Sequence, residues 1–439
     1  MEEKKLYIHT LGCQMNVQDA QKMAFLMEKS GYMTTDDPGD ADLIIVNTCS
    51  VREKAAQKAY SLIGRFRELK EEKPELILGV AGCLAQQQGD HFFKMFPCLE
   101  MVVGTNQIDR LPEIVSSVER SRLRFADTAF SRYVRSLDIP AQPLAGEVSS
   151  FVTIMQGCNN FCAYCVVPFL RGREQSRPLG DIVKEVEKLV EQGIQEVTLL
   201  GQNVNSYGKT LPDKPDFAQL LQAIGEIPGI RRIRFTTSHP KDLSEGLIAA
   251  FGKIPALCEH IHLPLQSGSN RILRLMKRGY TVEDYREKVA ALRESVPGIS
   301  ITSDIIVGFP GEEEADFEQT LQVLRDIRFD NLFSFQYSKR EHTPAVALAG
   351  HLAERIKRDR LKTLQKLQEG HTLEKNHALI GKSEGILVEG RSRKAGNEMT
   401  GRTRTNRIVN FPGNPELAGK LVRVKIVDAY LHSLRGEME

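Results

Sequence analysis

Three closely spaced cysteines are the residues in this sequence most able to do chemistry. Cys158, Cys162 and Cys165, here called the loop triplet, form a C-x₃-C-x₂-C motif directly after an apolar run. A closed structural zinc or [4Fe–4S] site takes four protein ligands. Three thiolates can instead hold three irons of a cubane and leave the fourth iron open to a chelating substrate. A zinc knuckle with a distant fourth ligand is the alternative.

A second set of cysteines is spread along the N-terminal third of the chain. Cys13, Cys49 and Cys83, here called the strand-end triplet, are 36 and 34 residues apart. One strand–helix–strand unit takes roughly 30 or more residues, so each cysteine is expected just past the end of a successive parallel strand. Such ends converge on the ligand crevice of an open sheet. The triplet therefore predicts an auxiliary cluster, with buried structural cysteines as the alternative. Cys98 and Cys258 fit neither set and are treated as structural, with a redox or sulfur-handling role as the alternative.

Six basic residues lie between Arg391 and Arg407, a stretch that contains a single acid, Glu398. They are Arg391, Arg393, Lys394, Arg402, Arg404 and Arg407. A cluster of this kind can neutralise RNA phosphates, and a solvated face is the alternative. Arg171, Arg173 and Arg177, after the loop triplet, are expected to face either the cofactor or RNA.

The pattern of residues 1–121 predicts a doubly wound α/β domain with a parallel sheet. Strands are expected at Leu6–Thr10, Ala41–Val46, Leu76–Ala81 and Met101–Val103, and helices at Val17–Glu28 and Arg52–Lys70. Residues 122–149 lose this regularity and read as a linker.

Residues 150–376 repeat the strand–helix alternation and predict a partial (βα)₆ barrel, whose active site lies at the C-terminal strand ends. The apolar runs are Phe151–Met155, Glu196–Leu200, Arg232–Phe235, His260–Leu265, Ile299–Val307 and Leu332–Phe335. Residues 377–439 predict a small all-β barrel from runs at Gly385–Glu389, Thr405–Asn410 and Leu421–Val427.

The composition is that of an ordinary globular protein, with 41% apolar and 26% charged residues in 439. The net charge of +2 indicates no partner, so any nucleic-acid signal must be local. We find no targeting peptide and no apolar run of about 18 residues, and we expect a cytoplasmic protein. In a reducing compartment the eight cysteines favour metal binding or catalysis over disulfides.

The loop triplet and the barrel that follows it resemble radical S-adenosylmethionine enzymes. That resemblance implies a [4Fe–4S] cluster whose open iron binds S-adenosylmethionine. It also implies that Tyr164 lies against the adenine, that Gln202 and Asn203 meet the methionine end, and that Ile305 and Gly308 flank the adenine. Ordinary packing of Tyr164 and a simple turn at Gly308 are the alternatives.

Further motifs resemble the methylthiotransferases within that superfamily, across essentially the whole chain. The motifs are Thr10–Asn16, Asn47–Glu53, Gly82–Gln86, Gln156–Glu174 and Pro264–Ser269. The similarity is greatest to the MiaB type, which acts on tRNA. It implies a methylthiotransferase domain at 1–121, a radical domain at 150–376 and an RNA-binding TRAM domain at 377–439.

The resemblance implies methylthiolation of carbon 2 of N6-dimethylallyladenosine at position 37 of the tRNA anticodon loop. Two [4Fe–4S] clusters and two molecules of S-adenosylmethionine per turnover would serve this reaction. One methylates a sulfur held at the strand-end triplet, and the other is cleaved at the loop triplet to a radical that takes the hydrogen from carbon 2. An electron donor such as flavodoxin or ferredoxin, a sulfur or cluster donor, no membrane and a monomeric state are implied as well.

Two other functions stay open at this point. Relatives modify N6-threonylcarbamoyladenosine in tRNA or an aspartate of a ribosomal protein. A non-catalytic iron–sulfur regulator that binds RNA would also explain the cysteines and the basic residues, although not why each cluster is one ligand short.

Overall fold

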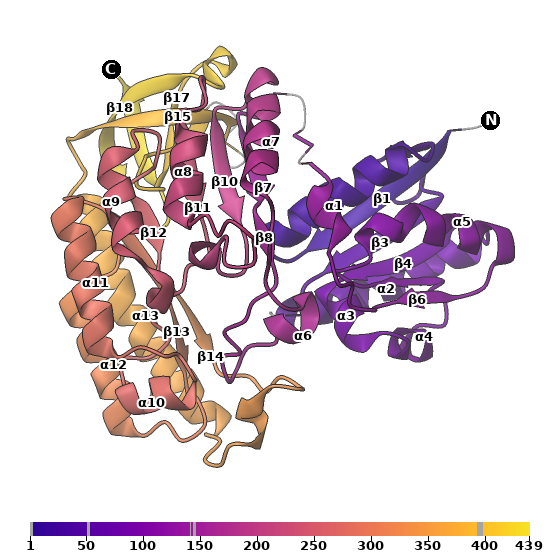
Figure 1. Cartoon of the computed structure of the whole chain (residues 1–439), viewed down its shortest axis with the longest axis horizontal. Coiled ribbons are helices and arrows are strands. Elements are labelled where there is room, and N and C mark those ends of the chain that lie inside the picture. The colour runs from indigo at the N-terminus through magenta and orange to yellow at the C-terminus, as the bar shows by residue number, and fades with distance from the viewer. Residues whose placement is uncertain (1–2, 51–52, 141, 144–145, 393–397) are drawn as a thin grey trace. The chain divides into compact units, whose positions relative to one another are not determined.

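The computed structural model describes residues 3–50, 53–140, 142–143, 146–392 and 398–439 (Figure 1). It contains two compact units. Unit 1 comprises Met1–Gln142, Thr153–Asn159 and Val166–Arg177, and unit 2 comprises Pro143–Val152, Asn160–Cys165 and Pro178–Glu439. Within the described ranges, no helix combines the length and the apolar character needed to cross a membrane.

Unit 1 contains a six-stranded sheet in the order β2-β1-β3-β4-β5-β6, with every neighbouring pair parallel. Its strands are β1 (Lys4–Leu11), β2 (Tyr32–Thr34), β3 (Leu43–Thr48), β4 (Ile77–Gly82), β5 (Met101–Val103) and β6 (Phe125–Asp127). The predicted doubly wound parallel sheet is confirmed. The edge strands β2 and β6 were not predicted. Unlike β5, which is as short but fully buried and apolar, they are largely not buried and carry no continuous apolar run.

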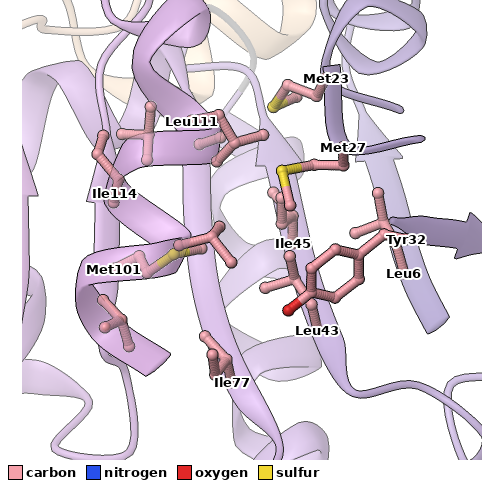
Figure 2. Close-up of a cluster of buried hydrophobic side chains, with 14 of the residues drawn as sticks. Leu6, Met23, Met27, Tyr32, Leu43, Ile45, Ile77, Met101, Leu111 and Ile114 are labelled. Atoms are coloured by element: carbon pink, nitrogen blue, oxygen red, sulfur yellow. The ribbon is translucent and has the colours of Figure 1, made fainter. Parts of the chain in front are cut away.

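Helices cover both faces of this sheet. They are α1 (Gln14–Glu28), α2 (Glu53–Glu72), α3 (Cys83–Gln88), α4 (His91–Met95) and α5 (Leu111–Ser121). Leu43 and Ile45 of β3 face a core shared with α1 and α5 (Figure 2), whereas Ile44 and Val46 face a core shared with α2. A strand covered on both faces must be apolar throughout, which explains its continuous hydrophobic run.

Unit 2 contains the incomplete barrel that the sequence predicted. It has two three-stranded sheets, β11-β10-β7 and β12-β13-β14, in which β10 pairs parallel with β11, and β13 with both β12 and β14. A parallel bridge links Ile233 of β11 to Leu257, which precedes β12. The strands are β7 (Ser149–Thr153), β10 (Glu196–Leu200), β11 (Arg232–Phe235), β12 (His260–His262), β13 (Ser300–Val307) and β14 (Asn331–Gln336). The helices are α7 (Leu179–Glu191), α8 (Phe217–Gly225), α9 (Glu245–Lys253), α10 (Asn270–Leu275), α11 (Val282–Ser295), α12 (Glu314–Ile327) and α13 (Glu354–His377).

The C-terminal part of unit 2 is a closed barrel in the order β15-β16-β17-β19-β18, drawn in yellow in Figure 1. Its strands are β15 (Ser383–Arg391), β16 (Glu398–Arg402), β17 (Ile408–Pro412), β18 (Leu421–Ala429) and β19 (Leu434–Met438). The all-β barrel is confirmed, but β16 and β19 were not predicted. The strand expected at Thr405–Asn410 begins only at Ile408 in the structure. Residues 403–407 form a turn instead, closed by a hydrogen bond from the Thr403 N–H to the Arg407 carbonyl.

Arginines at the N-terminal end of the (βα) barrel attach this small barrel to it. Arg232 donates to the carbonyls of Arg402 and Gly385, and Arg234 donates to those of Thr403 and Arg404. Arg234 also forms an ion pair with Glu196 at 3.0 Å, and both side chains are 6% exposed. The opposite, C-terminal strand ends are thereby left for ligands.

Candidate metal centres and cofactor site

The structure brings the strand-end triplet to one edge of the sheet. Cys13, Cys49 and Cys83 directly follow or adjoin the ends of β1, β3 and β4, which are neighbours in the sheet. These ends are level, because Leu11 pairs with Thr48 and Thr48 pairs with Gly82. Thiols that are 36 and 34 residues apart in sequence are therefore close in space.

The thiols of the strand-end triplet affect one another. A hydrogen bond from Cys49 lowers the pKa of Cys13 to about 5, helped by the charge of Arg171 and by backbone N–H groups at the start of α1, although burial opposes the shift. Burial raises the pKa of Cys83, and the Arg171 charge opposes this. Because the thiolate is the form that binds metal, Cys13 is a readier ligand than Cys83.

Two buried asparagines, to which the sequence analysis gave no role, hold the strand ends beneath these thiols. Asn47 Nδ2 donates to the Asn16 carbonyl at 2.7 Å, and Asn16 Nδ2 donates to Asn47 Oδ1 at 3.3 Å. Asn16 Oδ1 accepts from the Cys13 N–H and lies 3.4 Å from Cys13 Sγ. Asn47 is a fully buried amide in an otherwise mainly apolar strand, and that break in the pattern was the available signal.

Steric crowding explains why a glycine occupies position 82. Its φ is +90°, and a Cβ there would lie 2.7 Å from the Thr48 carbonyl oxygen and 2.6 Å from Asn47 Oδ1. At position 12, a Cβ would lie 2.9 Å from the Cβ of Cys49. Both glycines therefore allow the cysteine-bearing loops to approach one another.

Among the described residues, no three or more His, Cys, Asp or Glu side chains are grouped so that they could hold a metal ion. A [4Fe–4S] cubane differs from a single ion in binding each thiolate at a different iron.

The loop triplet is anchored in both units. In unit 1, the Cys158 N–H donates to the Gly172 carbonyl at 3.2 Å, and a Cβ at Gly157 would lie only 2.1 Å from the Arg173 carbonyl oxygen. In unit 2, Arg278 Nη1 donates to Cys162 Sγ at 3.3 Å, and the Cys165 N–H donates to the Cys162 carbonyl at 3.0 Å. Grouping these three cysteines in one site rests on their spacing in the sequence.

Three of the residues predicted to contact the cofactor are packed against other parts of the protein. Tyr164 is half-buried against the cluster that contains Met276 and Phe309. Ile305 is fully buried. Gly308 has φ +72°, and a Cβ there would lie 2.2 Å from Cγ of Lys357. Their contacts with S-adenosylmethionine stay predictions.

Within the described part of the chain, four buried polar atoms without hydrogen-bond partners belong to residues that follow the C-terminal ends of β10, β11 and β12. They are Asn203 Oδ1, Ser238 Oγ, His239 Nε2 and Gln266 Oε1. Of these residues, only Asn203 was predicted at the cofactor, and it also donates to Asp242 at 2.8 Å. Gln202, beside it, is half-buried. Buried polar atoms are normally satisfied, so this group fits a polar ligand.

His239 adds a donor to this group. Burial lowers its pKa to about 2, so the ring is neutral. Its Nδ1 accepts from the Lys241 N–H at 3.3 Å, which leaves the proton on Nε2. Together with two amide oxygens, this donor suits the ammonium and carboxylate of a methionine end.

The predicted RNA-binding arginines are mostly paired with acids. Arg402 pairs with Glu389 at 3.0 Å, Arg404 with Glu259 at 2.7 Å and Arg407 with Asp330 at 2.7 Å. Arg391 is exposed, and Arg393 and Lys394 lie outside the described residues. Of the arginines after the loop triplet, Arg171 and Arg177 are buried and Arg173 is exposed.

Comparison with known proteins gives matches over nearly the whole chain. Residues 5–104 match the Uncharacterized protein family UPF0004, residues 152–324 the Radical SAM superfamily and residues 378–438 the TRAM domain. A tRNA-2-methylthio-N(6)-dimethylallyladenosine synthase of Syntrophus aciditrophicus is 56% identical over 100% of this chain and 95% of its own. The enzyme of the same name from Geobacter metallireducens is 52% identical, over 99% and 98%.

The chain belongs to this family of synthases. It is therefore a radical S-adenosylmethionine enzyme of the methylthiotransferase type, and the cofactors of the family are S-adenosylmethionine and [4Fe–4S] clusters, as the sequence predicted.

Solved structures support the fold. A radical S-adenosylmethionine methyltransferase, TsrM from Kitasatospora setae, aligns with a TM-score of 0.59 at 15% identity over 89% of this chain and 79% of its own. The cobalamin-dependent enzyme OxsB aligns with a TM-score of 0.54 at 14% identity, over 84% and 56%. At these identities the likeness concerns the fold alone.

Proposed function

We propose that this protein transfers a methylthio group to carbon 2 of an N6-dimethylallyladenosine in the tRNA anticodon loop. The name shared by full-length relatives at 47–56% identity supports the substrate. The observation that carries the chemistry is the pair of cysteine triplets, since three thiolates can hold a cubane and leave one iron open. The TRAM match supports an RNA substrate.

In this proposal each triplet holds one [4Fe–4S] cluster. The ready ionisation of Cys13 and the convergence of three strand ends support the first site. The sequence spacing and the Arg278 hydrogen bond to Cys162 support the second. The bound cofactors supply the radical that an unactivated aromatic C–H carbon requires, and the protein supplies position. Asn203, His239 and Gln266 orient the polar end of S-adenosylmethionine.

The remaining features of the proposal concern partners and organisation. An electron donor such as flavodoxin or ferredoxin and a sulfur or cluster donor serve the enzyme, which acts as a monomer in the cytoplasm. Its functional domains are a methylthiotransferase domain at 1–121, a linker at 122–149, a radical domain at 150–376 and an RNA-binding domain at 377–439. The family and the three matched regions support this division.

Nucleoside mass spectrometry tests the substrate. A deletion strain complemented with this protein should regain 2-methylthio-N6-dimethylallyladenosine in its tRNA. Cys49→Ala and Cys162→Ala should abolish this product, and Cys98→Ala, a control outside both triplets, should retain it. If the wild-type protein restores only a methylthiolated threonylcarbamoyladenosine or ribosomal aspartate, the substrate is wrong. If the wild-type protein restores no methylthiolated product, the result favours a non-catalytic iron–sulfur regulator that binds RNA.

A further inference from the structure

A short helix after the loop triplet brings an arginine to the strand-end triplet. Helix α6 (Val167–Arg171) belongs to unit 1. Leu170 packs with Cys83 in one buried cluster, and Thr105 Oγ1 donates to the Leu170 carbonyl. These contacts fix the backbone of Arg171, whose side chain is only 4% exposed. A guanidinium is therefore held in the protein interior beside the cysteines.

The guanidinium of Arg171 is only partly satisfied by the protein. Its Nη2 forms an ion pair with Asp19 of α1 at 2.7 Å, and both side chains are almost fully buried. Its charge acts on the thiols of both Cys13 and Cys83. Its Nη1 is buried without a hydrogen-bond partner among the described residues. A buried donor without an acceptor is unusual and points to a ligand.

The charges at this edge favour an interaction with a cluster. When a cluster is bound there, its three thiolate ligands and the Asp19 carboxylate would be negative, and each added electron would increase the negative charge of the cluster. Buried charge is costly unless it is paired. Arg171 is placed to offset this charge, and hydrogen bonds to sulfur and local net charge set the reduction potentials of iron–sulfur clusters.

We propose that Arg171 donates a hydrogen bond from Nη1 to a sulfur of the auxiliary cluster and raises its reduction potential, while Asp19 orients the guanidinium and lowers that potential. This inference rests on the proposed function, which puts a cluster on the strand-end triplet. Arg171 is then a residue of the auxiliary site and not of the RNA surface.

The test uses the full chain with Cys158→Ala, Cys162→Ala and Cys165→Ala, so that only the auxiliary cluster is assembled. Iron content and a redox titration followed by electron paramagnetic resonance are measured after anaerobic reconstitution with iron and sulfide. Arg171→Gln should lower the midpoint potential, and Arg171→Lys should lower it less because the charge is kept. Asp19→Asn should raise it. Arg120→Gln, on the exposed side of α5, should leave it unchanged.

The opposite signs distinguish an electrostatic role from a structural one, since breaking the ion pair from either side disturbs the same packing. If Asp19→Asn and the Arg171 variants retain iron but shift the potential in the same direction or not at all, the inference is wrong and the proposed function stands. If Arg171→Gln loses its iron, the potentials of Arg171→Lys and Asp19→Asn decide instead: shifts of opposite sign support the inference, and shifts of the same sign or no shift contradict it. If the triple variant itself binds no iron, the proposed function fails and the inference fails with it.

Discussion

At the scale of single residues, the strand-end triplet depends on neighbours that are not ligands. Asn16 and Asn47 bond each other beneath the thiols, and Gly82 lets the β4 end approach them. These residues fix where the cysteines stand before any metal binds, which reduces the ordering that cluster assembly must impose.

Replacing Gly82 by alanine should therefore damage both stability and iron binding. Gly31→Ala is the matched control, because its φ is +86° against +90° for Gly82, but a Cβ there would meet nothing within 4 Å. We expect Gly31→Ala to lower the free energy of unfolding by about 1–2 kcal/mol from backbone strain alone. Gly82→Ala should cost a further ~1–3 kcal/mol from overlap. Urea unfolding and iron analysis measure the two effects; equal losses in both variants would contradict this account.

Removing Asn47 should have a narrower effect. Asn47→Ala breaks both bonds to Asn16 and leaves a buried amide unsatisfied, a loss of about 1–3 kcal/mol. In the variant that carries Cys158→Ala, Cys162→Ala and Cys165→Ala, only the auxiliary cluster can bind iron. We expect its iron content to fall when Asn47→Ala is added. Asn410→Ala, on the small C-terminal barrel, is the control. Full retention of iron with Asn47→Ala would show that the strand ends need no such support.

Residue spacing predicted the convergence of Cys13, Cys49 and Cys83, because strand–helix–strand units have a characteristic length. The same reasoning could not find the partners of charged residues. Arg404 and Arg407 were expected at an RNA surface, since Glu398 is the one acid between residues 391 and 407. Their acids, Glu259 and Asp330, lie 145 and 77 residues away along the chain. Long-range ion pairs leave no periodic signal.

At the scale of elements, strand β11 carries two buried arginines that attach the C-terminal barrel. Its position in a parallel barrel predicts apolar residues, yet Arg232 and Arg234 are buried there. Their guanidinium groups satisfy carbonyls of the closed C-terminal barrel, so a strand of one barrel carries the attachment of the other. The hydrophobic pattern of the sequence could predict the strand, but it could not predict this contact between the two barrels.

The attachment can be tested by truncating one partner. Arg234→Met removes the nearer ion-pair partner of buried Glu196, which keeps only Arg232 at 3.9 Å, and it also removes two bonds to carbonyls. We therefore expect a loss of about 3 kcal/mol in the free energy of unfolding. Adding Glu196→Gln should recover part of this loss, because it removes a buried charge that Arg232 alone pairs with at a longer distance. Urea unfolding gives the stability, and limited proteolysis follows release of residues 378–438. An unchanged stability in Arg234→Met would show that the attachment lies elsewhere.

Two arginines of the C-terminal barrel should behave differently toward tRNA. Arg391 on β15 is exposed, whereas Arg404 is held by Glu259 and the Leu257 carbonyl. Arg391→Gln should weaken tRNA binding and reduce the salt dependence of log K by about 1, as expected for one lost phosphate contact. Arg404→Gln should leave that slope unchanged. Filter binding across a salt series measures both, and the reverse order would make Arg404 the RNA contact.

At the scale of the whole molecule, the loop triplet crosses between the two compact units. Cys158 belongs to unit 1 and donates to the Gly172 carbonyl, whereas Cys162 belongs to unit 2 and accepts from Arg278. The order of domains, the doubly wound sheet and the six strands of the incomplete barrel could be predicted from periodicity. The edge strands β2 and β6, the bends of the C-terminal barrel and the partnerless buried atoms of Ser238 and Gln266 could not, because each depends on tertiary contacts.

Iron stoichiometry tests the central claim that each triplet holds its own cluster. After anaerobic reconstitution we expect about eight irons per wild-type chain, and about four in each variant that has one triplet replaced by alanine, since one [4Fe–4S] cluster is lost in each case. About four irons in the wild-type chain, or loss of all iron when either triplet is removed, would contradict two independent clusters.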